Sequence, residues 1–140
     1  MKEEVQEVTI PREAFGFGMP WEANYGFSQA LRVGSTLHIS GQLSHDMQGH
    51  FIGVDDFGLY VRTTLANLDR VLEHFGVTKR QIVETTVYVR ELRRHFQDMS
   101  RLHAEYFGDH RPASTVIGVV DLPLPDQLVE IAAVAAVDAT

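Results

Sequence analysis

The amino-acid sequence predicts a single α+β domain, in which a mixed β-sheet carries two helices on one of its faces. Three observations indicate this class. β-Branched segments and amphipathic segments follow one another in the order β-β-α-β-α-β-β, the last two strand segments are apolar on both faces, and 140 residues suffice for one core. Two helices cover only one face of a sheet. Because the other face must then meet solvent or a partner, we expect the chain to self-associate.

The predicted domain spans residues 1–140, and its first 24 residues have the character of an irregular lead-in that contains several aromatic side chains. Residues 27–33 and 36–40 follow as two strand segments. They flank the dipeptide Gly34-Ser35, which suits a two-residue turn, so the pair predicts a β-hairpin. Residues 41–57 combine Gly, Asp and His and are expected to form a loop.

Two segments have the periodicity of amphipathic helices. In the first, apolar side chains recur at alternating four- and three-residue steps from Val61 to Phe75, and Gly76 is suited to end the helix. The second helix is expected over residues 95–107, with Gly108 directly after it. Its inward-facing side chains are predicted to be Phe96, Met99, Leu102 and Tyr106.

Three further strands are predicted. The β-branched residues of 82–89 indicate a strand between the two helices, with Val83, Val87 and Val89 on one face. After the second helix, two apolar segments joined by a Pro-rich turn complete the chain.

A single carboxylate, Glu130, lies inside the last of these strands. Between Leu128 and Val137 the sequence contains no other charged or polar side chain. An ionised carboxylate in such surroundings costs several kcal/mol unless it is paired or hydrogen-bonded. Glu130 therefore has either a structural ion-pair partner or a chemical role, and the sequence alone leaves both interpretations open.

Composition excludes several classes of function. The chain has no cysteine, which removes disulfides, thiolate catalysis and cysteine-based zinc sites. The net charge of −7, without a block of Lys or Arg, argues against a nucleic-acid partner. No apolar run approaches the ~18 residues that span a membrane, and the first residues do not resemble a signal peptide. We therefore expect a cytoplasmic protein without a membrane-spanning segment.

Some candidate residues have a plain structural explanation. The segment 45–50 contains two His and one Asp, but it matches no metal motif, so a solvated loop is favoured over a metal site. His103 lies one step from the buried stripe of its helix, which favours a hydrogen-bonded boundary histidine. Trp21 and Tyr25 are expected to anchor the lead-in rather than to line a cleft.

Several segments, in the right order, resemble the RidA/YjgF family over about residues 25–137. The segments that carry the resemblance are Tyr25-Gly-Phe-Ser-Gln-Ala30, Ile39-Ser-Gly-Gln42, Ile82-Val-Glu-Thr-Thr-Val-Tyr-Val89, Pro112-Ala-Ser-Thr115 and Glu130-Ile-Ala-Ala-Val-Ala135. The resemblance implies a chorismate-mutase-like fold and a homotrimer with ligand clefts between subunits. It also implies cofactor-free hydrolysis of enamines or imines, such as 2-aminoacrylate, to keto acids and ammonia.

The family's site residues are matched only in part. Glu130 falls on the family glutamate, the predicted catalytic residue that positions water, and Gly41 falls on the glycine whose backbone faces the ligand. The other positions, also predicted to bind substrate, have changed: Phe27 replaces a tyrosine, Ser100 an asparagine, Ser114 the carboxylate-binding arginine and Val116 a cysteine. Serine cannot form the paired charge-assisted hydrogen bonds of an arginine. Efficient 2-aminoacrylate deaminase activity is therefore not expected.

Two functions follow from these observations. The first is a cofactor-free hydrolase or deaminase of an imine, enamine or related metabolite, with Glu130 as the catalytic group and Ser114 as a neutral hydrogen-bonding replacement for the arginine. The alternative is a trimer that binds a small ligand, without turnover or as a regulator. A nucleophilic Ser114 is not favoured, because the sequence anchors no histidine base beside it. A ribonuclease role, attributed to some family members, fits poorly with the acidic charge.

Overall fold

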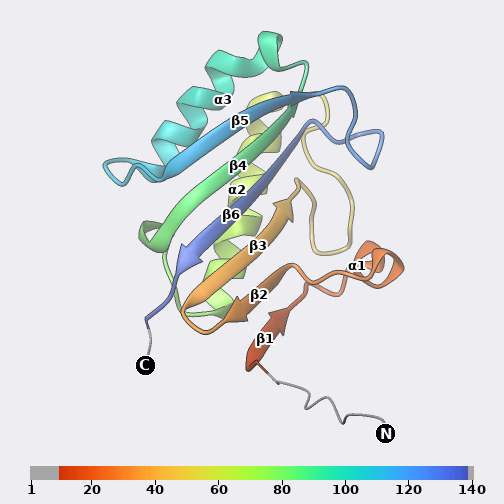
Figure 1. Cartoon of the computed structure of the whole chain (residues 1–140). Helices are drawn as coiled ribbons and strands as arrows, with labels where there is room; N and C mark the ends of the chain where they lie inside the picture. Colours follow the sequence, from red (N-terminus) through yellow and green to blue (C-terminus); the bar gives the residue numbers. More distant parts are fainter. Residues whose placement is uncertain (1–9, 139–140) are drawn as a thin grey trace, which may run out of the picture.

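The computed structural model describes residues 10–138, which form one six-stranded sheet with helices packed against it (Figure 1). The elements in chain order are β1 (Arg12–Phe15), α1 (Pro20–Tyr25), β2 (Ala30–Val33), β3 (Thr36–Gln42), α2 (Phe57–His74), a 3-10 turn η1 (Lys79–Gln81), β4 (Ile82–Arg90), α3 (Leu92–Phe107), β5 (Ala113–Val119) and β6 (Val129–Ala136).

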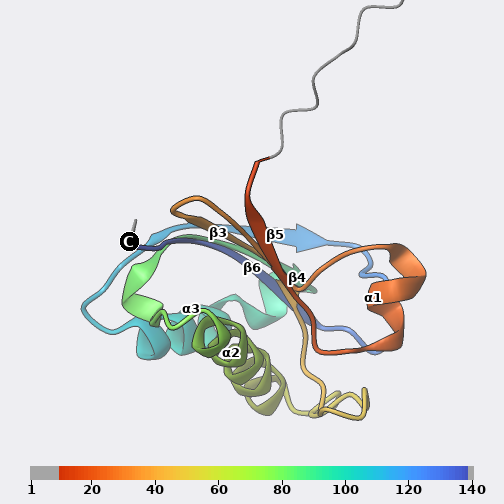
Figure 2. The same cartoon turned by 90° about the horizontal axis from the view of Figure 1, so that it is seen from below.

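The sheet is mixed, as predicted. Its strand order is β1-β2-β3-β6-β4-β5, and only the pair β4–β5 is parallel. Helix α3 makes the crossover that a parallel pair requires. Figure 2 shows α2 and α3 together on one face of the sheet, while the opposite face carries no helix from the described part of the chain, residues 10–138. The prediction of two helices on one face is therefore confirmed.

The core lies between this helical layer and the central strands. Alternate residues of β6, from Val129 to Ala135, are buried toward the helices. Helix α2 contributes the stripe that its sequence periodicity predicted, since Val61, Leu65, Leu68 and Leu72 are all buried. Its N-terminus is capped by Asp56, whose side chain accepts a hydrogen bond from the Leu59 N–H at 3.1 Å.

The prediction of an irregular lead-in is wrong for the described residues from 12 to 25. Residues 12–15 form edge strand β1, which pairs with β2, and residues 20–25 form α1. Glu22 organises this segment by accepting hydrogen bonds from the backbone N–H groups of Phe17, at 3.0 Å, and of Met19, at 3.3 Å. The strand is short and mostly exposed, so it carries no alternating apolar pattern that sequence reasoning could detect. The part of the lead-in before residue 10 lies outside the described residues.

Three finer predictions also need correction. The register of β4 against β6 shifts between Ile82 and Glu84, so Val83 is turned outward and is 49% exposed, and Thr85 is buried in its place. Phe96 is 50% exposed, since α3 begins at Leu92 and presents Met99 and Leu102 to the core instead. The first hairpin strand begins at Ala30 rather than at residue 27.

The helix-free face of the sheet carries both apolar and polar side chains. Register places Tyr88 of β4 beside Glu130, and Thr86 beside Ala132, on this face. Ile117 of the edge strand β5 is paired with Tyr88 and is 39% exposed. The exposed apolar side chain of Ile117 is suited to burial against a partner. Among residues 10–138, no helix has the length and apolar character needed to cross a membrane.

Candidate functional site

A cleft of about 260 Å³ opens at the end of the sheet where β3 finishes and β6 begins. Helix α1 contributes Trp21 and Tyr25 to its wall, and Glu130 lies in it at the start of β6. The expectation that the two aromatic residues only anchor the lead-in is therefore too narrow. Trp21 does both, because its ring also packs edge-on against the ring of His45, with centroids 5.3 Å apart.

Close packing joins Gly41 of β3 to Glu130 of β6. A β-carbon on residue 41 would overlap the Glu130 side chain at Cγ and Cδ, and it would lie 2.8 Å from Oε2. Glycine is thus required here by space, since the carboxylate side chain lies directly across the backbone of residue 41. The geometry brings Gly41, Glu130 and the cleft residue Phe27 together, as the sequence predicted for part of the site.

Gly41→Ala is expected to push the Glu130 carboxyl group out of its present position toward solvent. Loss of burial should move the Glu130 pKa down, toward the usual range of a carboxyl group. Side-chain NMR titration of both proteins measures this change directly. Gly58→Ala is a suitable control, because the only tight neighbour of a β-carbon there, among residues 10–138, is the flexible end of the Arg62 side chain at 3.0 Å; the Asp56 carboxylate is at an ordinary contact distance of 3.7 Å. An unchanged Glu130 pKa in Gly41→Ala would contradict the packing described.

Burial raises the pKa of Glu130, which is half-buried in the cleft wall. The neighbouring amide of Gln127 partly offsets this effect. Gln127 is held by its Oε1, which accepts the Leu124 N–H at 2.7 Å, whereas its Nε2 makes no hydrogen bond within residues 10–138. The Gln127 amide group therefore lines the same cleft as Glu130 without forming a hydrogen bond to it. Within residues 10–138 no cation pairs with Glu130, so a structural ion pair inside one chain does not explain it.

Glu130→Gln is expected to stabilise the protein at neutral pH. The folded-state pKa of Glu130 is raised, so between the unfolded pKa near 4.5 and the folded value the folded state binds more protons than the unfolded state. Stability therefore falls as pH rises through this window, and glutamine removes that loss. Denaturant unfolding at pH 4 and pH 7.5 tests the sign. The difference in unfolding free energy between Glu130→Gln and wild type should favour the variant more at pH 7.5 than at pH 4. The opposite trend would contradict a raised pKa for Glu130.

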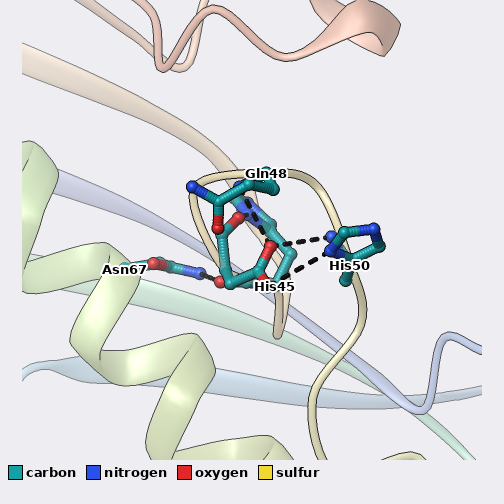
Figure 3. Close-up of polar contacts among 5 residues, drawn as sticks. His45, Gln48, His50 and Asn67 are labelled. Carbon is teal, nitrogen blue, oxygen red and sulfur yellow. Dashed lines mark hydrogen bonds and ion pairs between the residues drawn. The ribbon is translucent and has the colours of Figure 1, made fainter.

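The segment 45–50 forms a closed structural turn beside the cleft (Figure 3). The Asp46 carboxylate accepts the backbone N–H groups of Gln48 and His50, each at 2.9 Å. Asn67 of α2 donates to the His45 carbonyl at 3.0 Å and so ties the turn to the helix. Among residues 10–138, no group of three or more His, Asp or Glu side chains is placed to hold a metal ion. His45 is buried and lines the cleft with its ring.

The remaining predicted site residues lie elsewhere in the protomer. Ser114 of β5 is paired with Thr85 of β4, and their hydroxyl groups are 2.8 Å apart. Thr85 faces the helices, whereas Glu130 is paired with Tyr88, three residues further along β4, and faces the opposite side of the sheet. One chain therefore does not bring Ser114 and Glu130 together.

Val116 on β5 and Ser100 on α3 also lie outside the lining of the cleft that holds Glu130. Val116 follows two residues after Ser114 on edge strand β5 and packs against the core. Ser100 is exposed on α3. Conversely, Gln127 and His45 were not predicted as cleft residues. Neither carried a sequence signal, because a polar residue in a turn is ordinarily solvated and only the folded loops bury these two.

Comparison with known proteins gives consistent matches along most of the chain. Residues 20–137 match the family model described as Endoribonuclease L-PSP. A RutC family protein of Pyrococcus horikoshii is 35% identical over 109 residues, which cover 78% of this chain and 85% of that protein. The 3-aminoacrylate deaminase RutC of Acinetobacter baylyi is 28% identical over 106 residues, with coverage of 76% and 82%.

The fold is likewise similar to that of solved structures. The crystal structure of Rv2704 from Mycobacterium tuberculosis, described as a member of the YjgF/YER057c/UK114 family, superposes with a TM-score of 0.80 and 29% identity. The superposition covers 91% of this chain and all of that chain, at 100%. The comparison thus extends from the helical layer to the cleft-forming segments.

Proposed function

Starting from the fact that this chain belongs to the Endoribonuclease L-PSP family, which includes the RidA/YjgF and RutC proteins, we propose that it hydrolyses a small imine or enamine in the cleft beside Glu130. The observation that carries the proposal is a half-buried carboxylate that is held across the backbone of Gly41 and forms no ion pair with any of the described residues 10–138. The deaminase name of the Acinetobacter baylyi relative supports the reaction class.

In the proposed reaction, Glu130 accepts a proton from a water molecule as that water adds to the C=N carbon. Glu130 passes this proton to the imine nitrogen, which completes a carbinolamine. Glu130 then takes the hydroxyl proton of the carbinolamine and transfers it to the nitrogen, which leaves as ammonia while the carbonyl group forms. An enamine reaches the same path after tautomerising to the imine. A carboxyl group with a raised pKa is suited to this exchange, because it takes up and returns a proton near neutral pH more readily than an exposed one. The aromatic wall of Trp21, Tyr25 and Phe27 limits the site to a small ligand.

Self-association supplies the part of the site that one chain lacks. Ser114 is on the edge strand β5, and Glu130 is on the other side of the sheet, so a ligand can meet both only if β5 of one subunit approaches the cleft of another. The helix-free sheet face and the exposed Ile117 support the same assembly. We propose a homotrimer, in keeping with the family resemblance.

Sedimentation equilibrium is expected to give three times the chain mass of 15.7 kDa. A charged residue at the exposed position 117, as in Ile117→Asp, should shift the population toward the monomer, because an unpaired charge would be buried at the contact. The control is Val120→Asp, at a position that is 91% exposed and just past the end of β5. A wild-type mass of a single chain would refute the assembly.

The test of the proposed activity is ammonia release by wild-type protein from 3-aminoacrylate, from 2-iminopropanoate and from an amide of similar size, each generated or added freshly. We expect acceleration over the uncatalysed reaction for at least one imine or enamine and none for the amide. Saturable ligand binding without ammonia release would instead favour the alternative, a non-catalytic binding or regulatory protein. The net charge of −7 gives no support to a nucleic-acid substrate.

A further inference from the structure

Three side chains from α3, β4 and β5 form a continuous hydrogen-bonded chain on the helix-covered side of the sheet. His103 Nε2 lies 2.9 Å from the Thr85 hydroxyl oxygen, and the Thr85 hydroxyl is 2.8 Å from Ser114 Oγ. Thr85, in the middle, is completely buried, whereas Ser114 is exposed at its outer end. The chain therefore connects a half-buried, titratable ring to the surface of the edge strand.

The number of hydrogens that these three side chains can donate links the state of His103 to that of Ser114. Thr85 has a single hydroxyl hydrogen, so it can donate to only one neighbour at a time. When Thr85 donates to Ser114, it must accept from a protonated Nε2 of His103, and the Ser114 hydrogen is then free to donate outward. When Nε2 carries no proton, Thr85 donates to it, Ser114 donates to Thr85, and Ser114 offers only lone pairs to a ligand.

We propose that His103 is a positioning residue, which acts through Thr85 to decide whether the Ser114 hydroxyl donates or accepts a hydrogen bond at the bound metabolite. This inference rests on the proposed function in one respect, namely that Ser114 contacts the ligand. In the donating state Ser114 suits a carboxylate or carbonyl oxygen of that ligand. In the accepting state it suits an N–H group.

The surroundings of His103 allow both states. Burial lowers the pKa of His103, and no charged side chain of the described part of the protein contributes to the shift. On its own helix the ring packs against Phe107, with centroids 4.6 Å apart. On β4 the His103 ring contacts the uncharged hydroxyl group of Thr85, which in turn contacts Ser114 of β5. The next histidine, His110, contacts the Ile82 carbonyl through its Nε2, at 2.6 Å, and is not part of the chain.

The two protonation states of His103 have different consequences. In the neutral ring either nitrogen can carry the proton, so Ser114 can donate or accept. In acid both ring nitrogens are protonated, and only the donating arrangement of Ser114 remains. Acidification through the His103 pKa should therefore strengthen binding of an anionic oxygen at Ser114.

The hydrogen-bonded chain from His103 through Thr85 to Ser114 is tested first without any ligand, by nitrogen NMR of the His103 ring across pH. We expect Ser114→Ala and Thr85→Val each to shift the His103 tautomer ratio and pKa, and Thr85→Ser, which retains the hydroxyl, to restore wild-type values. His95→Gln is the control, because the pKa of His95 is also lowered but its ring stacks on Phe57, away from the chain. If neither Ser114→Ala nor Thr85→Val changes the His103 tautomer ratio or pKa, the proposed coupling between His103 and Ser114 is wrong.

The second test uses pyruvate as a carboxylate probe and measures its affinity at pH 7.5 and at a pH below the His103 pKa. Glu130 also titrates in acid, so the comparison is between wild type and His103→Gln at the same pH. We expect an acid-induced gain in affinity about 3-fold or more larger in wild type than in His103→Gln. Equal gains in the two proteins would overturn the role in ligand binding. If pyruvate binds neither protein, the ligand-contact part of the inference fails for carboxylates. The ammonia-release assay then still tests the proposed function, and the NMR experiment still tests the hydrogen-bonded chain.

Discussion

Glu130→Gln should reduce the turnover of the best imine or enamine substrate by ~10²–10⁴-fold, the range typical for loss of a general acid–base group. Glutamine keeps the size of the side chain and its position across Gly41, but it cannot take a proton from water. The loss is therefore expected in kcat, with KM changed little. Steady-state ammonia release by the two proteins measures both constants.

The matched control is Glu73→Gln, which neutralises an exposed carboxylate on α2 and should leave both constants unchanged. The same Glu130 variant is expected to be more stable at neutral pH, so loss of activity cannot be attributed to unfolding. Retained turnover in a folded Glu130→Gln protein would remove Glu130 from the mechanism and would favour the non-catalytic alternative.

Ser114→Arg is expected to raise kcat/KM on 2-aminoacrylate by ~100-fold, because a guanidinium group forms two charge-assisted hydrogen bonds with a carboxylate, each worth about 1.5–3 kcal/mol. The site should accept the larger side chain, since Ser114 is exposed on an edge strand. The gain in kcat/KM should appear only in a Ser114→Arg protein that retains Glu130.

Two further variants make this test specific. Ser114→Lys supplies a charge without the planar fork, so it should recover only part of the gain. Ser114→Arg combined with Glu130→Gln should lose the gained turnover while retaining carboxylate binding. If Ser114→Arg binds 2-aminoacrylate no better than wild type, residue 114 does not face the ligand, and the assignment carried over from the family is wrong at this position.

Predictions from the sequence succeeded where a pattern extends over several turns or strands. The apolar stripe from Val61 to Leu72 predicted α2, and the apolar run around Glu130 predicted β6. Burial of one continuous face of an element requires apolar residues at regular spacing in the sequence. Local irregularities of the structure have no such pattern in the sequence. The register shift at Ile82–Glu84 turned Val83 outward, and hydrogen bonds to Glu22 rather than apolar periodicity organise the segment before α1.

The candidate site was predictable only as a set of separate positions. Glu130 stood out because a lone carboxylate in an apolar strand is costly, and its closeness to Gly41 was implied by the family resemblance. The polar surroundings were not predictable. Gln127 and His45 lie in loops, and the chain from His103 to Ser114 joins residues 11 to 29 positions apart, whose hydroxyl and ring groups meet only after β4, α3 and β5 have packed.

The sequence by itself determined the fold class, and it singled out Glu130 as a candidate site residue, because strand and helix periodicity and an isolated charge are properties of neighbouring residues. Tertiary structure alone decided that Glu130 and Ser114 face opposite sides of the sheet, and that Ser114 ends a chain of hydrogen bonds from His103. The physical reason is that the side of a sheet on which two distant side chains meet depends on strand order and register, which no local pattern specifies.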